Sequence, residues 1–406
     1  MLSGRTIKER ALELGFDLAG IAPLNVSKDL EFSRQWVENG FNGEMRYLEN
    51  PKRFDPLLVL PSAKSAVCVG LVYNTPLPYS TEVAGAALAL RGWISRYAWG
   101  RDYHEIMRAK LELLRAAIEA SAPEAQTRVF VDTGPVAERA FARFSGIGWM
   151  GKNTCIINQE KGSWLFLGII LCSLELAPDL LAPDRCGSCT ACLEACPTGA
   201  LVEPYAMDAS RCISYLTIEL RGSIPNEFRT KMGSNVFGCD ICQDVCPWNT
   251  SHRPSAPSSQ QTAAAHERPP EAPGATRPAT TTIQEFHPMF VKPFQARSPS
   301  GTAAGQQTTG DGQQIPDPAG FSLFNPPFEE LASMSEEDFR RMFAHSPIKR
   351  AKYRGWLRNL AVAMGNSGDA RLAPWLERMA RHTDPVVREH AAWALERLRQ
   401  KSSASA

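Results

Sequence analysis

Apolar and polar residues in the first 175 positions follow two different periods. Three segments carry apolar residues at helical spacing: Ile7–Leu14, Leu30–Asn39 and Tyr103–Ala122. Two others are almost entirely apolar: Ser65–Tyr73 and Ser163–Cys172. The second kind is typical of strands buried on both faces, because a strand with one solvated face would alternate. A short strand over Arg128–Val131 adds to these, so the pattern predicts an α/β domain over residues 1–175, with a sheet covered by helices.

The last eighty or so residues return to a helical period. Four segments are expected to be helices: Ser335–Phe343, Tyr353–Met364, Arg371–His382 and Pro385–Leu398. Ser335, followed by three acids, is a suitable N-cap, and Asp384 before a proline is another. The apolar stripe of the last helix contains small residues that allow close stacking. The pattern predicts α-helical, HEAT-like repeats over residues 321–400.

Residues 251–320 differ in composition from everything around them. They are rich in Pro, Ala, Ser, Thr, Gln and Gly and poor in large apolar residues. Such a segment cannot bury enough surface to offset the entropy of ordering. We therefore expect most of this segment to be a disordered linker or insertion, with FHPMFVKPF (286–294) as a piece able to dock.

Length and charge set broad limits on the protein. A chain of 406 residues predicts two or three domains, and 44% hydrophobic residues allow sizeable cores. The net charge of +1 leaves any contact with a polyanion to local patches. The N-terminal segment has no apolar run typical of a signal peptide, and no window approaches the ~20 apolar residues of a membrane span. We expect a cytoplasmic monomer that makes no membrane contact.

Eight cysteines within residues 176–250 have the spacings of iron–sulfur ligands. The first run reads C-x2-C-x2-C-x3-C-P and the second C-x2-C-x3-C-P, with one cysteine between them. A proline after the last cysteine turns the chain away from a cluster. In the bacterial ferredoxin signature, the fourth cysteine of the first run binds the other cluster. This predicts a ferredoxin-like insert with two [4Fe-4S] clusters, one bound by Cys186, Cys189, Cys192 and Cys246 and the other by Cys196, Cys212, Cys239 and Cys242.

Two other uses of these cysteines are less consistent with the pattern. Zinc also binds C-x2-C pairs, but a zinc site closes at four ligands, and the additional Cys and Cys-Pro suit a cluster better. A disulfide framework is typical of short secreted chains, not of one this long without a secretion signal. The remaining cysteines, Cys68, Cys155 and Cys172, lie in or beside apolar runs and are expected to be buried packing residues.

The segment Val131–Ile157 is the densest in residues that carry chemistry. Asp132 follows an apolar strand end, where α/β folds form ligand crevices. Against an apolar wall it would keep its proton near neutral pH and act as an acid. Taken alone, the spacing favours a cap for a helix over Val136–Phe144. The loop Gly146–Thr154 fits either a close backbone approach to a ligand or a plain surface turn.

Other stretches are ambiguous on their own. The run Tyr97–His104 mixes aromatic and charged residues, as either a ligand site or a solvated helix start does. Ser214 lies two residues after Cys212 and is expected beside the second cluster. A basic run forms either a solvated face or a phosphate patch: Lys349, Arg350, Lys352, Arg354 and Arg358. No Gly-rich dinucleotide fingerprint or Walker loop is present, which argues against NAD, Rossmann-bound FAD and ATP.

Taken in order, these motifs resemble the epoxyqueuosine reductases, cobalamin-dependent iron–sulfur enzymes of tRNA modification. The resemblance covers nearly everything outside 251–320. It rests on these segments: GEMRYL, RFDP, SRYAWGRDYH, VDTGPVAERAFA, GWMGKNT, GSWLFLG, CGSCTACLEACPTGAL, RCISYLTIE, GCDICQDVCPWN, RNLAVAMGN and VVREHAAWAL.

The resemblance implies an activity, cofactors and site residues. Members reduce the epoxide of epoxyqueuosine to queuosine, the last step of queuosine biosynthesis, at the wobble position of tRNAs for Tyr, His, Asn and Asp. It implies base-off cobalamin in the N-terminal domain, fed with electrons by the clusters from an unidentified reductant. The family's acid falls on Asp132, as a proton donor to the epoxide oxygen. Seven residues are implied to contact cobalamin: Arg53, Tyr97, Asp132, Asn153, Thr154, Ile156 and Ser214.

The resemblance also gives the C-terminal helices a role, since they and their basic run are implied to grip the anticodon arm. Two other functions share part of this pattern. A corrinoid reductive dehalogenase shares the cofactors, but those proteins usually carry a twin-Arg export signal and no HEAT-like tail. A plain electron carrier would bind no corrinoid, so cobalamin absorbance in the reconstituted protein separates it from both enzymes.

Overall fold

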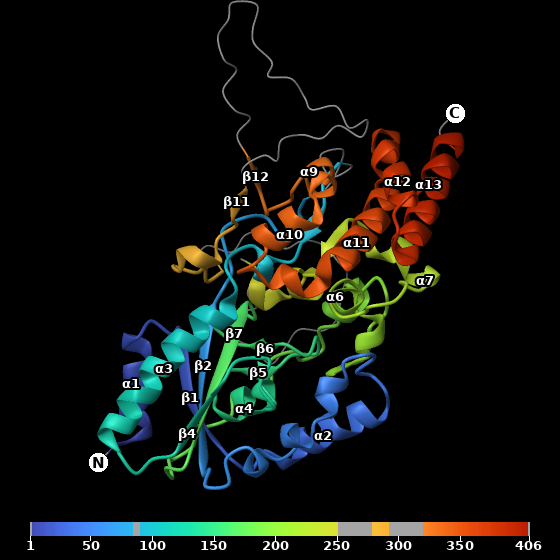
Figure 1. Ribbon diagram of the computed structural model, residues 1–406. Coiled ribbons are helices and arrows are strands. Elements are labelled where there is room, and N and C mark those ends of the chain that lie inside the picture. The colour runs from blue at the N-terminus through green and yellow to red at the C-terminus, as the bar shows by residue number, and fades with distance from the viewer. Residues whose placement is uncertain (1, 84–89, 251–277, 292–319, 405–406) are drawn as a thin grey trace, which may run out of the picture.

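The structure is a computed structural model, and it describes residues 2–83, 90–250, 278–291 and 320–404. Three units follow one another along the chain in Figure 1. They are a sheet covered by helices, a unit of short elements that carries the cysteines, and a group of C-terminal helices. The predicted mixed α/β fold class is therefore confirmed.

The N-terminal unit is built on a four-stranded antiparallel sheet with the order β1-β2-β7-β4. Its strands are β1 (Leu18–Pro23), β2 (Ser65–Val72), β7 (Leu165–Cys172) and β4 (Thr127–Phe130). The last three match the predicted strands. The pattern does not predict β1, because the short run LAGIAP contains glycine and proline and has no clear period.

Helices cover both faces of this sheet, which explains why β2 and β7 are almost entirely apolar. Val67 and Val69 of β2 belong to the core on the side of α1 and α3. Ala66 and Cys68 belong to the core on the opposite side, with α2 and α4. The four helices are α1 (Gly4–Glu13), α2 (Ser27–Glu38), α3 (Tyr103–Ser121) and α4 (Glu138–Phe144).

The cysteine-rich unit consists of short helices and strands joined by tight turns. It contains α5 (Ala191–Ala195), β8 (Leu201–Glu203), β9 (Ala206–Met207), α6 (Ile213–Ile218), α7 (Asn226–Arg229), β10 (Asn235–Phe237) and α8 (Ile241–Asp244). The two short helices that carry cysteines, α5 and α8, contact each other. Strand β10 pairs in parallel with β3 (Trp93–Ile94), which ties this unit to the N-terminal one.

The C-terminal unit is helical, as the pattern predicts. Its helices are α9 (Phe328–Ser333), α10 (Glu336–Met342), α11 (Lys352–Ser367), α12 (Ala373–Ala380) and α13 (Pro385–Ala404). Ser335 caps α10 in a capping box, and the Asp384 carboxylate accepts the backbone N–H of Val386 at 2.8 Å, so both predicted caps are confirmed. Helices α11 and α13 approach closely where Gly365 meets Ala394, since a Cβ at Gly365 would lie 2.7 Å from that of Ala394.

Part of the segment predicted as a linker is folded. Residues 278–291 lie against the N-terminal unit: the Thr281 N–H donates to the Asn74 carbonyl at 2.7 Å, and the buried Phe286 ring meets Phe166 edge-on. Strand β11 (Phe290–Val291) then pairs with β12 (Phe321–Ser322). Residues 286–291 belong to the piece expected to dock, and the structure places them against a partner surface. Residues 278–285 pack there as well, although they fall in the segment expected to be mostly linker. The rest of that prediction lies outside the described residues.

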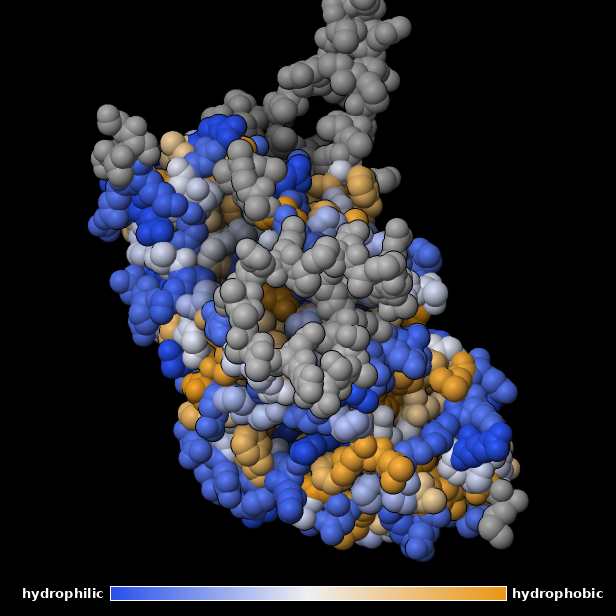
Figure 2. Space-filling view, turned by 180° about the vertical axis from the view of Figure 1, so that it is seen from behind, coloured by the Kyte–Doolittle hydropathy of each residue, from blue (hydrophilic) through white to orange (hydrophobic). Residues whose placement is uncertain are grey.

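The surface is largely polar on the face turned away in Figure 1. Figure 2 shows this face as mostly hydrophilic, with apolar side chains gathered in small separate patches. Within the part of the chain that the structure describes, none of the helices has the length and apolar content that a bilayer crossing requires.

Candidate active site

Asp132 lies in a strained turn just after β4 and directly follows the buried Val131. The Thr133 N–H donates to the Val131 carbonyl at 2.6 Å, and Asp132 between them has φ of 49°. A positive φ is uncommon for a residue other than glycine and tends to mark functional sites. The N-cap position of α4 is occupied by Ala137, without a side-chain cap. The cap interpretation of Asp132 is therefore wrong.

The turn presents the Asp132 carboxylate to the N-terminus of α3. The Tyr103 hydroxyl donates to it at 2.9 Å, and Nε2 of His104 lies 3.4 Å from Oδ2. On its other side the His104 ring contacts Asp102, with 2.7 Å between Nδ1 and Oδ1. Asp102 is also the N-cap of α3, accepting the His104 N–H at 3.1 Å. Because 62% of the Asp132 side chain is exposed, its carboxylate is open to an incoming ligand.

These contacts decide where the protons reside. Burial alone would lower the pKa of His104, but Asp102 and Asp132 raise it to about 9. Desolvation by the surrounding protein would raise the pKa of Asp132 even though its side chain is largely exposed, but His104 and Tyr103 hold that pKa below its usual value. The prediction that apolar surroundings keep Asp132 protonated near neutral pH is therefore wrong. At neutral pH the proton of this pair resides on the imidazole.

A second carboxyl group near Asp132 behaves in the opposite way. Burial, and then the charge of Asp132, raise the pKa of Glu138 to about 8, whereas Arg53 opposes the rise. Glu138 Oε1 has no hydrogen-bond partner among the described residues. The Arg53 guanidinium donates to the Gly134 carbonyl at 2.7 Å, just behind the Asp132 turn. Two acids whose pKa values are pushed apart are characteristic of sites that move protons.

The glycine-rich loop is buried and connects the sheet to both cysteine runs. It joins β5 (Trp149–Met150) to β6 (Ile156–Ile157) in a hairpin. The Lys152 ammonium donates to the carbonyls of Gly187 (2.7 Å) and Cys189 (2.9 Å), and the Asn153 amide donates to the Cys242 carbonyl at 3.1 Å. Both side chains are buried, so a plain surface turn is excluded.

Some of the eight cysteines lie near the partners that the predicted sets give them, although Cys242 also has Cys192 of the other set as a neighbour. The full division into two sets stays a prediction. Burial and the neighbouring charges of Cys186 and Cys192 raise the pKa of Cys246 to about 12. Burial and the charge of Cys212, with a smaller effect of Cys196, raise the pKa of Cys239. A cysteine late in the sequence thus joins the early run, and an early cysteine joins the late one, as the crossover requires.

The chemistry of this donor set fits two cubane clusters. All eight cysteines are free thiols, and Cys189 is exposed whereas the others are at least partly buried. Among the described residues, no three His, Cys, Asp or Glu side chains converge on one metal ion. The thiolates around a cubane each bind a different iron atom, so they surround a cluster instead of meeting at one point.

Some of the residues implied to contact cobalamin touch either the Asp132 site or the cysteine-rich unit. Tyr97 packs edge-on against Tyr103, with ring centroids 6.3 Å apart, and a Cβ on Gly238 would lie 3.5 Å from the Tyr97 ring. Thr154 has φ of 64°, and its carbonyl accepts from Arg139 of α4 at 2.7 Å. Ser214 follows Cys212 and hydrogen-bonds to its sulfur, and Ile156 is buried in β6.

The basic run is less available than its sequence indicates. Lys349 pairs with Asp102 at 2.9 Å, Arg350 with Glu219, and Arg354 with Asp384 at 2.8 Å. Lys352 is exposed.

Arg358 does not belong to this basic surface. It is 1% exposed, and its guanidinium donates to three carbonyls, those of Leu216, Leu220 and Gly222. Its inclusion in a phosphate patch is wrong, because a buried arginine that joins two units is not available to an external phosphate. The helical spacing of the run hid this, since Arg358 falls on the inner face of α11.

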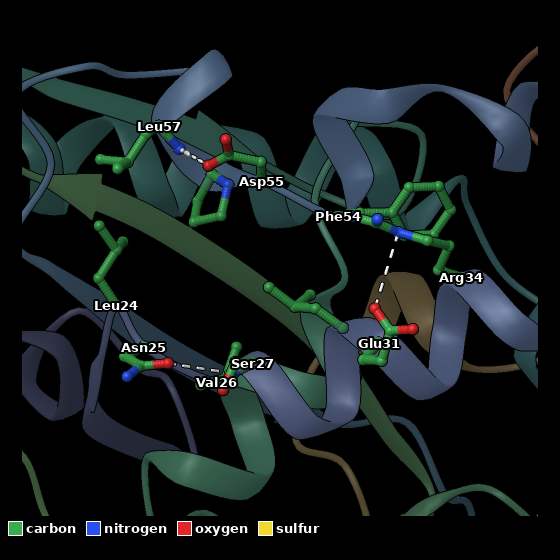
Figure 3. Close-up of a pocket in the computed structure, with 11 residues that line it drawn as sticks. Leu24, Asn25, Val26, Ser27, Glu31, Arg34, Phe54, Asp55 and Leu57 are labelled. Atoms are coloured by element: carbon green, nitrogen blue, oxygen red, sulfur yellow. Dashed lines mark hydrogen bonds and ion pairs between the residues drawn. The ribbon is translucent and has the colours of Figure 1, made fainter.

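The hollow in Figure 3 is a separate feature. It has a volume of about 410 Å³ and lies between the start of α2 and the segment Phe54–Leu57. Its polar side chains mostly bond within their own turns, such as Asp55 with the Leu57 N–H. It includes none of the predicted site residues, so it does not contribute to the Asp132 site.

The sequence pattern points to the segment containing His104 but assigns no role to His104, Asp102, Tyr103 or Glu138. The available signal in the sequence was the pair Tyr103-His104, which has a charged residue on either side and stands at the start of a predicted helix. What it could not supply was the distance between this helix start and Asp132, which depends on how α3 packs on the sheet.

The chain is similar to known proteins of one family over nearly its whole length. A family model for a 4Fe-4S double cluster binding domain matches residues 185–249, and a model for the epoxyqueuosine reductase QueG matches residues 53–133. The chain is 37% identical to the epoxyqueuosine reductase of Pseudomonas aeruginosa, over 97% of this chain and 94% of that protein. It is 35% identical to the enzyme of Escherichia coli, over 96% and 88%.

Solved structures show the same likeness. A crystal structure of epoxyqueuosine reductase with a tRNA-Tyr epoxyqueuosine-modified stem loop is 30% identical, with a TM-score of 0.75. It matches 97% of this chain and 89% of that one. A selenomethionine-labelled epoxyqueuosine reductase gives a TM-score of 0.73 at 29% identity, over 97% and 90% of the two chains.

Proposed function

The chain belongs to the epoxyqueuosine reductase family, and we propose that it reduces the wobble-position base of tRNA with two [4Fe-4S] clusters and base-off cobalamin. Its class of reaction is the conversion of epoxyqueuosine to queuosine in tRNA. The observation that carries the finer proposal is the joint position of an exposed, strained Asp132 and two four-thiolate groups, joined by the Lys152–Asn153 loop.

The two cysteine groups differ in exposure, and this difference indicates which group accepts electrons from outside and which passes them to the cobalamin site. Bound clusters would supply single electrons, and bound cobalamin would supply a low-potential metal centre for the reduction. The first group contains the exposed Cys189 and faces an external reductant. The second lies beside Asn153 and Ser214, two of the residues we assign to cobalamin binding. The others are Arg53, Tyr97, Asp132, Thr154 and Ile156.

The reaction requires protons as well as electrons. Removing an epoxide oxygen to leave an alkene consumes two electrons and two protons and releases water. We assign Asp132 as the group that delivers a proton to the epoxide oxygen as its C–O bond breaks, because its carboxylate is open to the substrate side and held by Tyr103 and His104. The Tyr103 hydrogen bond keeps the carboxylate oriented through the step.

We assign the remaining parts to substrate binding. Residues 1–175 would form the cobalamin-binding unit, 176–250 the cluster unit and 321–400 a HEAT-like unit that grips the anticodon arm of tRNAs for Tyr, His, Asn and Asp. One structural relative was solved with such a stem loop. A modified wobble base must leave the loop stack to reach Asp132, as bases generally do in enzymes that act on them. The protein would act as a cytoplasmic monomer with an external reductant.

A complementation assay tests the proposed function. A strain that lacks epoxyqueuosine reduction is given this chain, and its tRNA is digested and analysed for queuosine. We expect queuosine to replace epoxyqueuosine, and the reconstituted protein to show cobalamin absorbance in addition to cluster absorbance. Persistent epoxyqueuosine in the presence of soluble, cluster-loaded protein would contradict the activity, and an active protein without a corrinoid would contradict the cofactor.

Charge reversal tests the tRNA-binding surface. Lys352 is exposed and 46% of the Arg354 side chain is exposed, so the Lys352→Glu/Arg354→Glu variant should weaken tRNA binding. Removing one phosphate contact lowers the slope of log affinity against log salt by about 0.7–0.9. Fluorescence titration of an anticodon stem loop at several salt concentrations measures both quantities. Lys28→Glu/Lys64→Glu, with the same charge change on the exposed N-terminal unit, is the control. Equal losses of affinity in the two variants would indicate a general charge effect only.

A further inference from the structure

A chain of four charged groups connects the C-terminal helical unit to Asp132. It begins at the Lys349 ammonium, 2.9 Å from Oδ2 of Asp102. The other oxygen of Asp102 lies 2.7 Å from Nδ1 of His104, whose Nε2 faces Asp132 at 3.4 Å. Every link joins opposite charges once the imidazole is protonated. The chain ends at the exposed carboxylate that the proposed function assigns to proton delivery.

The C-terminal unit also holds this chain through its backbone. The Asp102 N–H donates to the His345 carbonyl at 2.7 Å, and the His345 ring contacts Glu105 at 2.9 Å. The Asp102 side chain is buried, 7% exposed, and its two oxygens are used by Lys349 and His104. Asp102 therefore cannot rotate away from His104 without breaking contacts to another unit of the protein.

We propose that His104, held by Asp102, is the positioning residue that stores the proton which Asp132 delivers to the epoxide oxygen. This rests on the proposed role of Asp132. The proton on His104 Nε2 moves to Asp132 Oδ2 and from there to the epoxide oxygen, so that imidazolium becomes neutral imidazole. Because His104 Nε2 is itself buried, it then regains a proton from solvent through the exposed Asp132 carboxylate.

The groups around Asp132 favour His104 as the proton source over Tyr103 and Glu138. Burial and the charge of Asp132 raise the pKa of Tyr103 well above its ordinary value, so Tyr103 keeps its proton and orients the carboxylate. Glu138 also retains a proton, but its Oε1 makes no hydrogen bond among the described residues. Arg350 and Lys349 face the carboxylates, and Glu105 faces His345. Of the two groups whose polar atoms point at Asp132, Tyr103 and His104, His104 is the one that carries a proton it can release near neutral pH.

The distance of 3.4 Å between His104 Nε2 and Asp132 Oδ2 is consistent with the state of the site before substrate binds. Nε2 of His104 has no hydrogen-bond partner among the described residues, although it lies within ion-pair distance of Asp132. Catalytic hydrogen bonds are often long before substrate binds and shorten in the complex. A bound epoxide would displace solvent from the Asp132 carboxylate and draw the pair together.

The pH dependence of a single turnover tests this store. Holoenzyme is mixed with epoxyqueuosine stem loop, and queuosine formation is followed from pH 6 to 10. In the wild type the rate should fall as the pH rises through about 9, where His104 loses its proton. Asp102→Asn removes the carboxylate that raises the pKa of His104, so the fall should move towards pH 6.5. His104→Gln should lower the rate by about 10²–10⁴-fold and abolish this limb.

A direct titration separates a proton store from a structural role. Nitrogen-15 labelling of the seven histidines in the full-length protein gives the imidazole pKa without reference to activity, and loss of one signal in His104→Gln assigns it. His287→Gln, in a histidine outside this chain of charged groups, is the matched control. An unshifted limb in Asp102→Asn, or a His104 signal that titrates near 6.5 in the wild type, would overturn the inference. Normal turnover by His104→Gln would also overturn it while leaving the proposed function intact. Absence of turnover in the wild type would instead contradict the proposed function.

Discussion

Asp132→Asn is expected to keep the fold, the clusters and cobalamin and to lower turnover of epoxyqueuosine tRNA by about 10²–10⁴-fold, the usual contribution of a positioned acid. Asparagine is the better substitution because φ at this position is 49°, a conformation that Asn tolerates and Ala resists. The Asn side chain still accepts the Tyr103 hydrogen bond, but it has no negative charge to face His104 and cannot take up and pass on a proton. The measurement is the single-turnover rate at saturating stem loop, with absorbance confirming that the cofactors are bound.

Asp55→Asn supplies the matched control. Asp55 caps a short helix, where Asn serves equally well, and it lies at the hollow of Figure 3 and not at the site. It should keep the wild-type rate. If Asp132→Asn also kept that rate, Asp132 would not deliver the proton, and His104 would lose its reason to store one. If Asp132→Asn failed to retain cobalamin, a loss of turnover would reflect the binding role of Asp132 and would not support proton delivery.

The helices and strands with a clear apolar pattern could be predicted from the sequence, because burial against the rest of the protein produces that pattern. β2 and β7 are apolar throughout because helices cover both faces of the sheet, and the C-terminal helices carry a clear apolar stripe and two good caps. Strand β1 was not predicted, because Gly20 in this strand packs directly on the backbone of Ser145. A residue chosen for a close approach of the backbone leaves no periodic signal.

The site was open to prediction only in part. Cysteine spacing reflects how a loop wraps a cluster, so the ligands can be predicted from the sequence. The same spacing predicts that Cys246 joins the first group, and Cys246 lies near Cys186 and Cys192. Asp132 was ambiguous, because an acid between a strand end and a helix is more often a helix cap than a site residue, and its spacing favoured the cap. The deciding facts, a positive φ and the approach of His104, depend on packing between α3 and the sheet.

Charged residues were the hardest to place. Arg358 and Lys349 lie in one basic run, yet Arg358 is buried against carbonyls of α6 and the loop after it, whereas Lys349 reaches Asp102 at the N-cap of α3. Both contacts bridge units distant in sequence. A pattern read along one helix shows which face is charged, but the partner across the interface comes from another part of the chain.

Cys212 is the ligand on which the cluster assignment depends most, because it stands alone between the two runs. Cys212→Ser should remove one cluster and leave the other, so that iron falls from about eight to about four atoms per chain. Turnover should be lost, because the second group lies beside Asn153 and Ser214, two of the residues assigned to cobalamin binding. Iron analysis and low-temperature paramagnetic resonance of the reduced protein measure the two clusters separately.

Cys155→Ser is the control that makes this test sharp. Cys155 lies beside Cys192 and Cys212, whose charges add to the effect of burial in raising its pKa to about 11, so it is the non-ligand cysteine best placed to substitute for a ligand. We expect it to keep both clusters. If Cys155→Ser lost half of the iron and Cys212→Ser did not, the second cluster would be bound by Cys155 instead. Loss of all iron in Cys212→Ser would mean that the two sites fold as one, because α5 and α8 carry cysteines of both groups and contact each other.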